Sequence, residues 1–174
     1  MNYFELYGLP VTFNPDPNVI KQKFYALSKE FHPDFYINES PEKQEEVLEL
    51  STLNNKAYQV LSDPQKRLQY ILDLKGLIKE GENYVLPQTF LMEMMDVNEA
   101  LMELEFEPDP SKLLQVKLLV DDIEKDLFDE LYALTAFFEN LVPEAQDSAL
   151  LSIKDIYYRN KYLLRIRQSL ERIK

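Results

Sequence analysis

The only histidine of the 174-residue chain lies in the tripeptide His32-Pro33-Asp34. An imidazole and a carboxylate this close could act in acid–base catalysis, but no nucleophile, metal-ligand cluster or glycine-rich phosphate loop accompanies them. Docking is the other chemistry open to this tripeptide. The ring of Pro33 stiffens the backbone, which lowers the entropy lost on binding, and Asp34 offers a fixed acceptor to an arginine of a partner. We therefore interpret the tripeptide as a protein-docking loop, and we expect no enzyme activity.

Two predicted helices hold this loop between them. The pairs Asp16-Pro17 and Ser40-Pro41 each place a good N-cap before a proline at the first helical position. The first helix has apolar residues at helical spacing, namely Ile20, Phe24, Leu27 and Phe31. The second has a similar stripe, made of Val47, Leu50, Asn54, Ala57 and Leu61. The two helices can pack antiparallel across a loop at 32–40, and Asn54 on the stripe then needs a hydrogen-bond partner.

The rest of the chain also has helical periodicity. A short helix is predicted over 64–74, and it ends at Lys75-Gly76. Three longer helices over 88–106, 110–140 and 143–173 are predicted to form an antiparallel bundle. We therefore predict an all-α fold with three parts, which are an N-terminal unit at 1–76, a linker at 77–87 and a three-helix bundle at 88–174.

Composition excludes several classes of function. A net charge of −12 disfavours nucleic-acid binding, and the absence of cysteine excludes disulfides and thiolate metal sites. We find no signal peptide and no apolar run of about 20 residues, so we expect a cytoplasmic protein that does not enter a membrane. Residues 76–148 carry 18 Asp and Glu against 4 Lys and Arg, whereas residues 149–174 carry 7 Lys and Arg against 2 Asp and Glu. The basic C-terminal segment is therefore expected to pair with the acidic middle.

The predicted helix at 88–106 carries more apolar surface than a bundle requires. One complete core face comprises Phe90, Met94, Val97, Leu101 and Leu104. A second stripe of Leu91, Met95 and Met102 lies beside carboxylates at about 100–140° from that face. The stripe could simply widen the core. The alternative is a protein-binding patch, in which methionines adapt to a partner and the acidic rim selects a basic one.

Residues 1–75 resemble a J domain in four segments that occur in the family's order. These segments are Tyr3 to Leu9, the apolar stripe from Ile20 to Phe31, the His32-Pro33-Asp34 tripeptide, and Asn55 to Pro64. For the tripeptide alone, a loop histidine held by local hydrogen bonds is the simpler interpretation, but the four segments together favour docking. The resemblance implies binding to a DnaK-type ATPase chaperone. The residues expected to contact it are His32, Pro33, Asp34, Lys21, Lys23, Lys29 and Tyr25. Phe35 stands where J domains often carry a basic residue, which suggests a specialised partner.

A J domain followed by a three-helix bundle resembles the HscB family of iron–sulfur biogenesis co-chaperones. The segment Phe90-Leu91-Met92-Glu93 looks like the helix with which that family binds the scaffold protein IscU. By matched position, the resemblance implies a scaffold-binding set of Leu91, Met92, Met95, Asp96, Glu99, Glu103 and Tyr158, with Tyr157 as the alternative aromatic. It also implies an HscA-type chaperone partner and no cofactor.

Two other hypotheses remain open. The chain could be a J-domain co-chaperone for a different client protein. It could also be a small helical enzyme or metal-binding protein that uses the carboxylates of Asp121, Asp122, Glu124 and Asp126. Such a run is more often a solvated helix face, and a single histidine provides no ligand cluster, so we expect no metal.

Overall fold

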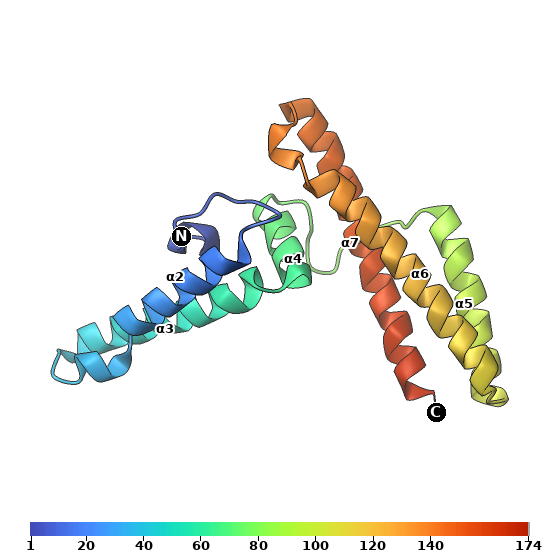
Figure 1. The fold of residues 1–174 in the computed structure, drawn as a ribbon, viewed down its shortest axis with the longest axis horizontal. Helices are drawn as coiled ribbons and strands as arrows, with labels where there is room; N and C mark the ends of the chain where they lie inside the picture. Colours follow the sequence, from blue (N-terminus) through green and yellow to red (C-terminus); the bar gives the residue numbers. More distant parts are fainter. Residues whose placement is uncertain (174) are drawn as a thin grey trace. The chain divides into compact units, whose positions relative to one another are not determined.

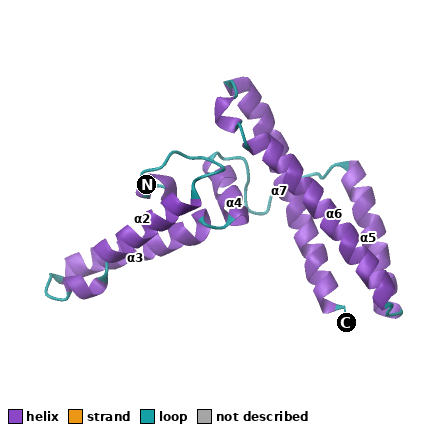
Figure 2. Ribbon diagram, in the orientation of Figure 1, coloured by secondary structure: helices purple, strands orange, loops and turns teal. Residues whose placement is uncertain are grey.

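The computed structural model describes residues 1–173, and over these residues the protein is helical, with no strand (Figure 2). The chain divides into two compact units between Ile78 and Lys79. The all-α fold predicted from the sequence is confirmed. No helix within the described range is both long enough and apolar enough to cross a membrane.

The first unit is a helical hairpin with short flanking helices (Figure 1). Its elements are α1 (Tyr3–Leu6), α2 (Pro17–Glu30), a 3₁₀ turn (Pro33–Tyr36), α3 (Pro41–Leu61) and α4 (Pro64–Leu74). The side chains of Asp16, Ser40 and Asp63 accept hydrogen bonds from the first backbone N–H groups of α2, α3 and α4. These caps, each followed by proline, fix where the helices begin. Helices α2 and α3 lie side by side, and the 3₁₀ turn lies at the far tip of their hairpin.

The predicted apolar stripe of α3 forms the core of the first unit. Val47, Ala57 and Leu61 are buried, and Asn54 among them is only 1% exposed. The Asn54 amide donates hydrogen bonds to the Phe24 carbonyl at 3.2 Å and to the Ser28 hydroxyl at 3.1 Å. The predicted need of Asn54 for partners is therefore met, and its hydrogen bonds join α3 to α2.

The second unit is a bundle of α5 (Gln88–Phe106), α6 (Pro110–Thr135) and α7 (Pro143–Arg172), with a 3₁₀ turn at Phe138–Asn140. The prediction that the middle helix runs to residue 140 was wrong. The last α-helical hydrogen bond here runs from the Ala136 N–H to the Tyr132 carbonyl, and the backbone then changes direction. Phe138 in this turn is buried, the turn contacts α7, and Pro143 begins that returning helix. Residue 174, at the end of the predicted bundle, lies outside the described residues.

Arginines of α7 pair with carboxylates of α6, as the uneven charge of the chain predicts. Arg159 contacts Glu130 at 3.0 Å, and Arg167 contacts Asp121 at 2.6 Å and also Glu124. The hydrogen bond with Asp121 is the largest cause of a raised pKa for Arg167. The cationic C-terminal helix therefore neutralises part of the acidic middle segment within the bundle.

The segment predicted as a linker, 77–87, is packed over much of its length. Ile78 is buried in the first unit. In the second unit, Glu82 forms an ion pair with Lys154 of α7 at 2.7 Å, and the Tyr84 hydroxyl donates to Asp155 of α7 at 2.6 Å. The start of α5 is therefore attached to α7 by polar contacts as well as by the core.

Candidate protein-binding sites

The His32-Pro33-Asp34 loop has a defined conformation although its side chains are open to solvent. His32 is extended, and Pro33 starts the 3₁₀ turn, in which the Phe35 N–H donates to the His32 carbonyl at 3.1 Å. The Asp34 N–H donates to His32 Nδ1 at 3.3 Å. Because Nδ1 accepts, the neutral ring carries its hydrogen on Nε2. The His32 and Asp34 side chains are 54% and 79% exposed, so a partner can reach both.

Two side chains that the sequence did not single out hold this loop. The Tyr36 hydroxyl donates to the Glu30 carbonyl at the end of α2, at 2.7 Å. The Gln44 amide of α3 donates to the carbonyls of Ile37 and Glu39 at 2.9 and 3.1 Å. Both ends of the turn are therefore attached to the hairpin, which preorganises the loop for binding. No sequence periodicity marks Tyr36 or Gln44, so pattern analysis could not find them.

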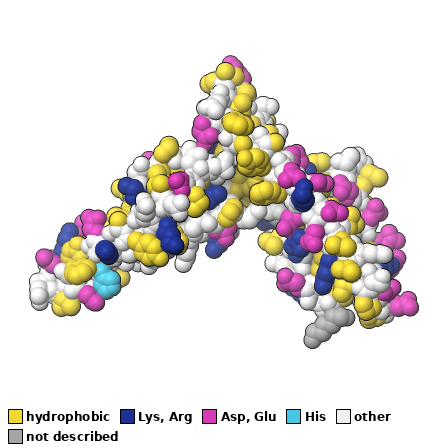
Figure 3. All heavy atoms as spheres, in the orientation of Figure 1, with side chains coloured by type: hydrophobic (Ala, Val, Ile, Leu, Met, Phe, Trp, Pro, Cys, Tyr) yellow, Lys and Arg dark blue, Asp and Glu magenta, His cyan; other side chains and the backbone are white. Residues whose placement is uncertain are grey.

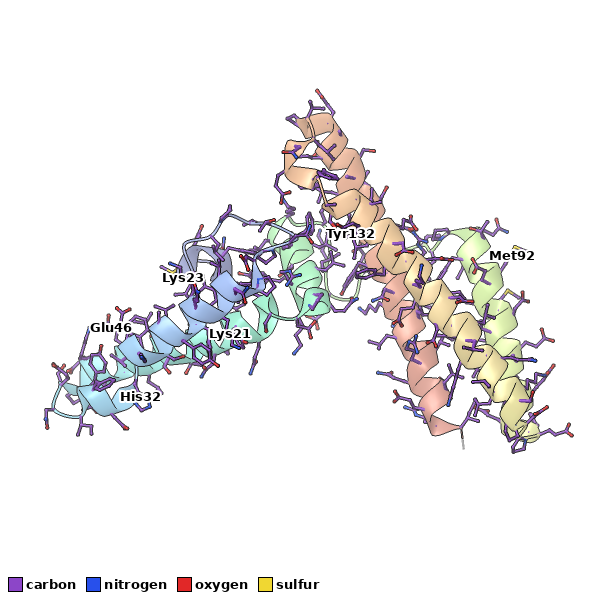
Figure 4. All side chains as sticks on the ribbon, in the orientation of Figure 1. Lys21, Lys23, His32, Glu46, Met92 and Tyr132 are labelled. Carbon is purple, nitrogen blue, oxygen red and sulfur yellow. The ribbon has the colours of Figure 1, made fainter. Side chains whose placement is uncertain are left out.

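The predicted basic residues of α2 are all exposed, but they do not share one face. At about 100° per residue, Lys21, Tyr25 and Lys29 lie on one side of α2. Lys23 lies on the other side, as Figure 4 shows for Lys21, Lys23 and His32. The face continuous with the loop therefore combines two lysines with Tyr25, which is 56% exposed.

Exposed apolar side chains border the loop. Phe35 is 73% exposed and Ile37 is 68% exposed. The Phe35 ring meets the His32 ring edge-on, with centroids 6.0 Å apart. A hollow of about 400 Å³ beside them is lined by Pro33, Asp34 and Leu48, among others. The loop therefore offers a partner apolar contact as well as polar groups.

Helix α5 separates a core face from an exposed face. The predicted core residues Phe90, Met94, Val97, Leu101 and Leu104 are each at most 5% exposed, so that prediction is confirmed. Leu91 is 38% exposed, whereas Met95 and Met102 are 69% and 61% exposed. The alternative in which these three side chains widen the core is therefore wrong.

The other α5 residues of the predicted patch are open to solvent as well. Met92 is 61% exposed and projects from α5 in Figure 4. Asp96, Glu99 and Glu103 are exposed, and Glu103 forms an ion pair with Lys112 at the start of α6. Figure 3 shows acidic and hydrophobic side chains mixed over the surface of this unit. The six α5 residues of the predicted set therefore lie together on one accessible helix.

Tyr158, the seventh member of that set, has local partners on α7 and on the segment before α5. Its hydroxyl donates to Glu82 at 2.6 Å, and its ring stacks on Tyr84 with centroids 4.5 Å apart. Tyr157, the alternative, is half-buried and meets Tyr158 edge-on. The structure thus does not bring Tyr158 to the exposed methionines. One α7 side chain that does contact α5 is Tyr162, which accepts a hydrogen bond from Asn98 at 3.0 Å.

The contact between Tyr158 and Glu82 shifts both pKa values. The hydrogen bond from Lys154, followed by that from Tyr158, lowers the pKa of Glu82. Desolvation, followed by the hydrogen bond to Glu82, raises the pKa of Tyr158, so the hydroxyl stays protonated. Desolvation and the hydrogen bond to Asp155 raise the pKa of Tyr84 to about 12. These tyrosines therefore act as structural donors at neutral pH.

Across the described part of the chain, no group of three or more His, Asp or Glu side chains could hold a metal ion. The carboxylates of Asp121 and Glu124 are instead engaged by Arg167.

Comparison with known families agrees with the two units. Residues 2–70 match the DnaJ domain, and residues 86–171 match the family described as the HSCB C-terminal oligomerisation domain. The first match, on the hairpin that carries the His32 loop, makes this a J-domain protein.

Relatives match over both units together. A co-chaperone protein HscB homolog of Vibrio cholerae is 30% identical over 174 residues, which are 99% of this chain and 96% of the relative. A homolog from Shewanella amazonensis is also 30% identical, over 173 residues and the same shares of the two chains. The chain belongs to the HscB family of co-chaperones.

Solved structures show the same arrangement of helices. Chaperone HscB from Vibrio cholerae aligns with a TM-score of 0.72 and 30% identity, covering 99% of this chain and 97% of the other. The crystal structure of human co-chaperone protein HscB aligns with a TM-score of 0.76 and 27% identity, covering 98% and 81%. The two-unit fold is therefore shared with bacterial and human members.

Proposed function

We propose that this protein is an adaptor that brings an IscU-type iron–sulfur scaffold to a DnaK-type, HscA-like chaperone and stimulates the ATPase of that chaperone. The observation that carries the proposal is the coexistence of two exposed, preorganised surfaces on separate units. One is the His32 loop, and the other is the outer face of α5. The protein itself performs no covalent step, and it acts in the cytoplasm.

The loop is suited to a partner that presents arginine and acidic groups. The exposed carboxylate of Asp34 can accept a paired hydrogen bond from a guanidinium. His32 accepts through Nδ1 within the loop, which leaves its Nε2–H as a donor toward the partner. Lys21 and Lys29, on the same side of α2, favour an acidic surface next to the arginine. The hydrogen bonds of Tyr36 and Gln44 reduce the entropy lost when the loop binds.

The outer face of α5 is suited to a scaffold protein that presents basic groups around an apolar contact surface. Met92 and Met95 present flexible thioethers that fill irregular gaps. Asp96, Glu99 and Glu103 form an acidic rim, which favours association with a basic partner and selects against acidic ones. An iron–sulfur cluster carried by the scaffold would be cargo, and this chain would need to supply no ligand to it.

The test is the steady-state ATPase of the HscA-type chaperone of the same organism, measured with and without this protein. We expect His32→Gln and Asp34→Asn to lose most of the stimulation. Asp73→Asn, an exposed change on α4 away from the loop, is the matched control and should stimulate like the wild type. Stimulation by either loop variant at the wild-type level would refute the proposed mechanism.

A further inference from the structure

The exposed face of α5 continues beyond the residues discussed so far, to the last residue of the helix. Phe106 is 90% exposed and Met102 is 61% exposed. They lie four residues apart, and at about 100° per residue both fall on the same side of α5 as Met95 and Glu99. A phenylalanine this open contributes almost nothing to the core, so its apolar area is available to a partner.

An open hollow of about 740 Å³ at the corner between α5 and α6 is lined in part by these two side chains. Its lining includes Met102 and Phe106 together with Glu99, Glu103, Glu107 and Lys112. The hollow therefore has an apolar part and a rim of carboxylates. Because Glu99 and Glu103 also belong to the predicted scaffold-binding set, the hollow is continuous with that surface.

The charge of the hollow is unbalanced. Lys112 is engaged by Glu103. Asp109 caps α6 by accepting from the N–H groups of Ser111 and Lys112 at 3.0 and 3.3 Å. Within the part of the chain that the structure describes, no ion pair is formed by Glu99 or Glu107. These two carboxylates therefore remain available to cations from outside the molecule.

The corner that forms the hollow is stiff. The Glu107 N–H donates to the Glu103 carbonyl at 2.8 Å and closes α5, and the backbone of Glu107 is then extended. Pro108 and Pro110 lie on either side of the Asp109 cap, and the ring of each proline restricts the backbone at its own position. The backbone that carries Phe106 is therefore restricted, which lowers the entropy lost when a partner binds at this corner.

We propose that this hollow extends the scaffold-binding surface and determines its specificity, by receiving a segment of the IscU-type scaffold in which an apolar side chain lies beside Lys or Arg. The proposal rests on the proposed function, because it takes the scaffold as the occupant. The apolar side chain packs on Phe106 and Met102, and the cations meet Glu99 and Glu107. A second copy of this chain is a poorer occupant, because both copies carry a net charge of −12.

The test is calorimetric titration of the purified scaffold into the full-length protein. We expect Phe106→Ala to weaken binding at least tenfold, which corresponds to about 1.4 kcal/mol. We expect the double variant Glu99→Gln with Glu107→Gln to weaken binding and to make it less dependent on salt. Phe128→Ala is the matched control, since this α6 side chain is 64% exposed and does not line the hollow. It should bind like the wild type.

A second comparison separates this proposal from the proposed function. If Met92→Ala with Met95→Ala weakens scaffold binding while Phe106→Ala binds like the wild type, the extension is overturned and the adaptor function stands. If the wild-type protein does not bind the scaffold at all, both proposals fail. If Phe106→Ala only converts a dimer of this chain to a monomer in sedimentation, with scaffold binding unchanged, the hollow serves self-association and the proposal is likewise overturned.

Discussion

The hydroxyl of Tyr7 donates a hydrogen bond to the side-chain oxygen of Asn54 at 2.9 Å, and both residues are 1% exposed. Burial is the largest cause of a raised pKa for Tyr7, so the hydroxyl remains a donor. Asn54 in turn donates to the Phe24 carbonyl and the Ser28 hydroxyl of α2. One buried amide thus joins the start of the chain to both helices of the hairpin that presents the His32 loop.

Asn54→Ala should destabilise the first unit by about 2–3 kcal/mol, because it removes three side-chain hydrogen bonds, to Tyr7, Phe24 and Ser28, from a nearly fully buried position. Urea unfolding followed by circular dichroism would measure this loss. Asn55→Ala, at the exposed neighbouring position, is the control and should change stability by less than about 0.5 kcal/mol. Equal stability of the two variants would show that the Asn54 hydrogen bonds contribute little.

Met92→Ala combined with Met95→Ala should weaken scaffold binding by about 2 kcal/mol or more, because a central apolar contact is lost. Calorimetry would measure the change in Kd. The control is Leu114→Ala combined with Leu118→Ala, which removes comparable exposed apolar area from α6. Unchanged binding by the methionine variant would favour a client other than the scaffold.

Tyr36→Phe should loosen the His32 loop without altering the tripeptide, because it removes the hydrogen bond to the Glu30 carbonyl. With about 0.5–1.5 kcal/mol lost per hydrogen bond, the concentration for half-maximal ATPase stimulation should rise a few-fold, while maximal stimulation is retained. Tyr132→Phe changes an exposed tyrosine of α6 in the same way and should have no effect. A Tyr36 variant with the wild-type titration curve would show that this anchor does not preorganise the loop.

Glu82→Gln should lower the melting temperature at neutral pH but not in strong acid. The hydrogen bonds from Lys154 and Tyr158 lower the pKa of Glu82 below its ordinary value of 4.5. Its stabilising effect is therefore complete above pH 4.5 and is lost as the pH falls through the lowered pKa. Melting curves measured from neutral pH down to strong acid would show the difference in melting temperature between wild type and Glu82→Gln becoming smaller. The control Glu80→Gln, at an exposed position, should show no such trend. A difference that stays constant into acid would contradict the prediction.

Local patterns predicted most of the fold. Apolar spacing identified the core face of α5, from Phe90 to Leu104, and Asx–Pro and Ser–Pro pairs located the starts of helices. The same spacing failed at the end of α6, because Leu131, Leu134 and Phe138 continue the helical period through a turn. Periodicity reports which residues are buried, and it does not distinguish burial in a helix from burial in a turn that follows one.

The sites were predictable where they lie on a single element. The exposed residues of α5 follow from the helical period of one helix. The contacts of Tyr158 could not be predicted in this way, because its partners Glu82 and Tyr84 lie 76 and 74 positions away and no spacing rule links them. The separation of Lys23 from Lys21 and Lys29 follows from the period of α2, whereas charge alone groups the three lysines together.

Each of the two surfaces lies on a unit with its own hydrophobic interior, centred on residues such as Leu61 in the first and Val97 in the second. If the proposed function holds, a substitution that adjusts the His32 loop to a changed chaperone therefore needs no compensating change in α5, the helix proposed to bind the client. During evolution, the sequence of each unit can then change together with that of its own partner, at a rate independent of the other unit. The same independence makes exchange of halves between relatives a direct way to assign a change in partner preference to one of them.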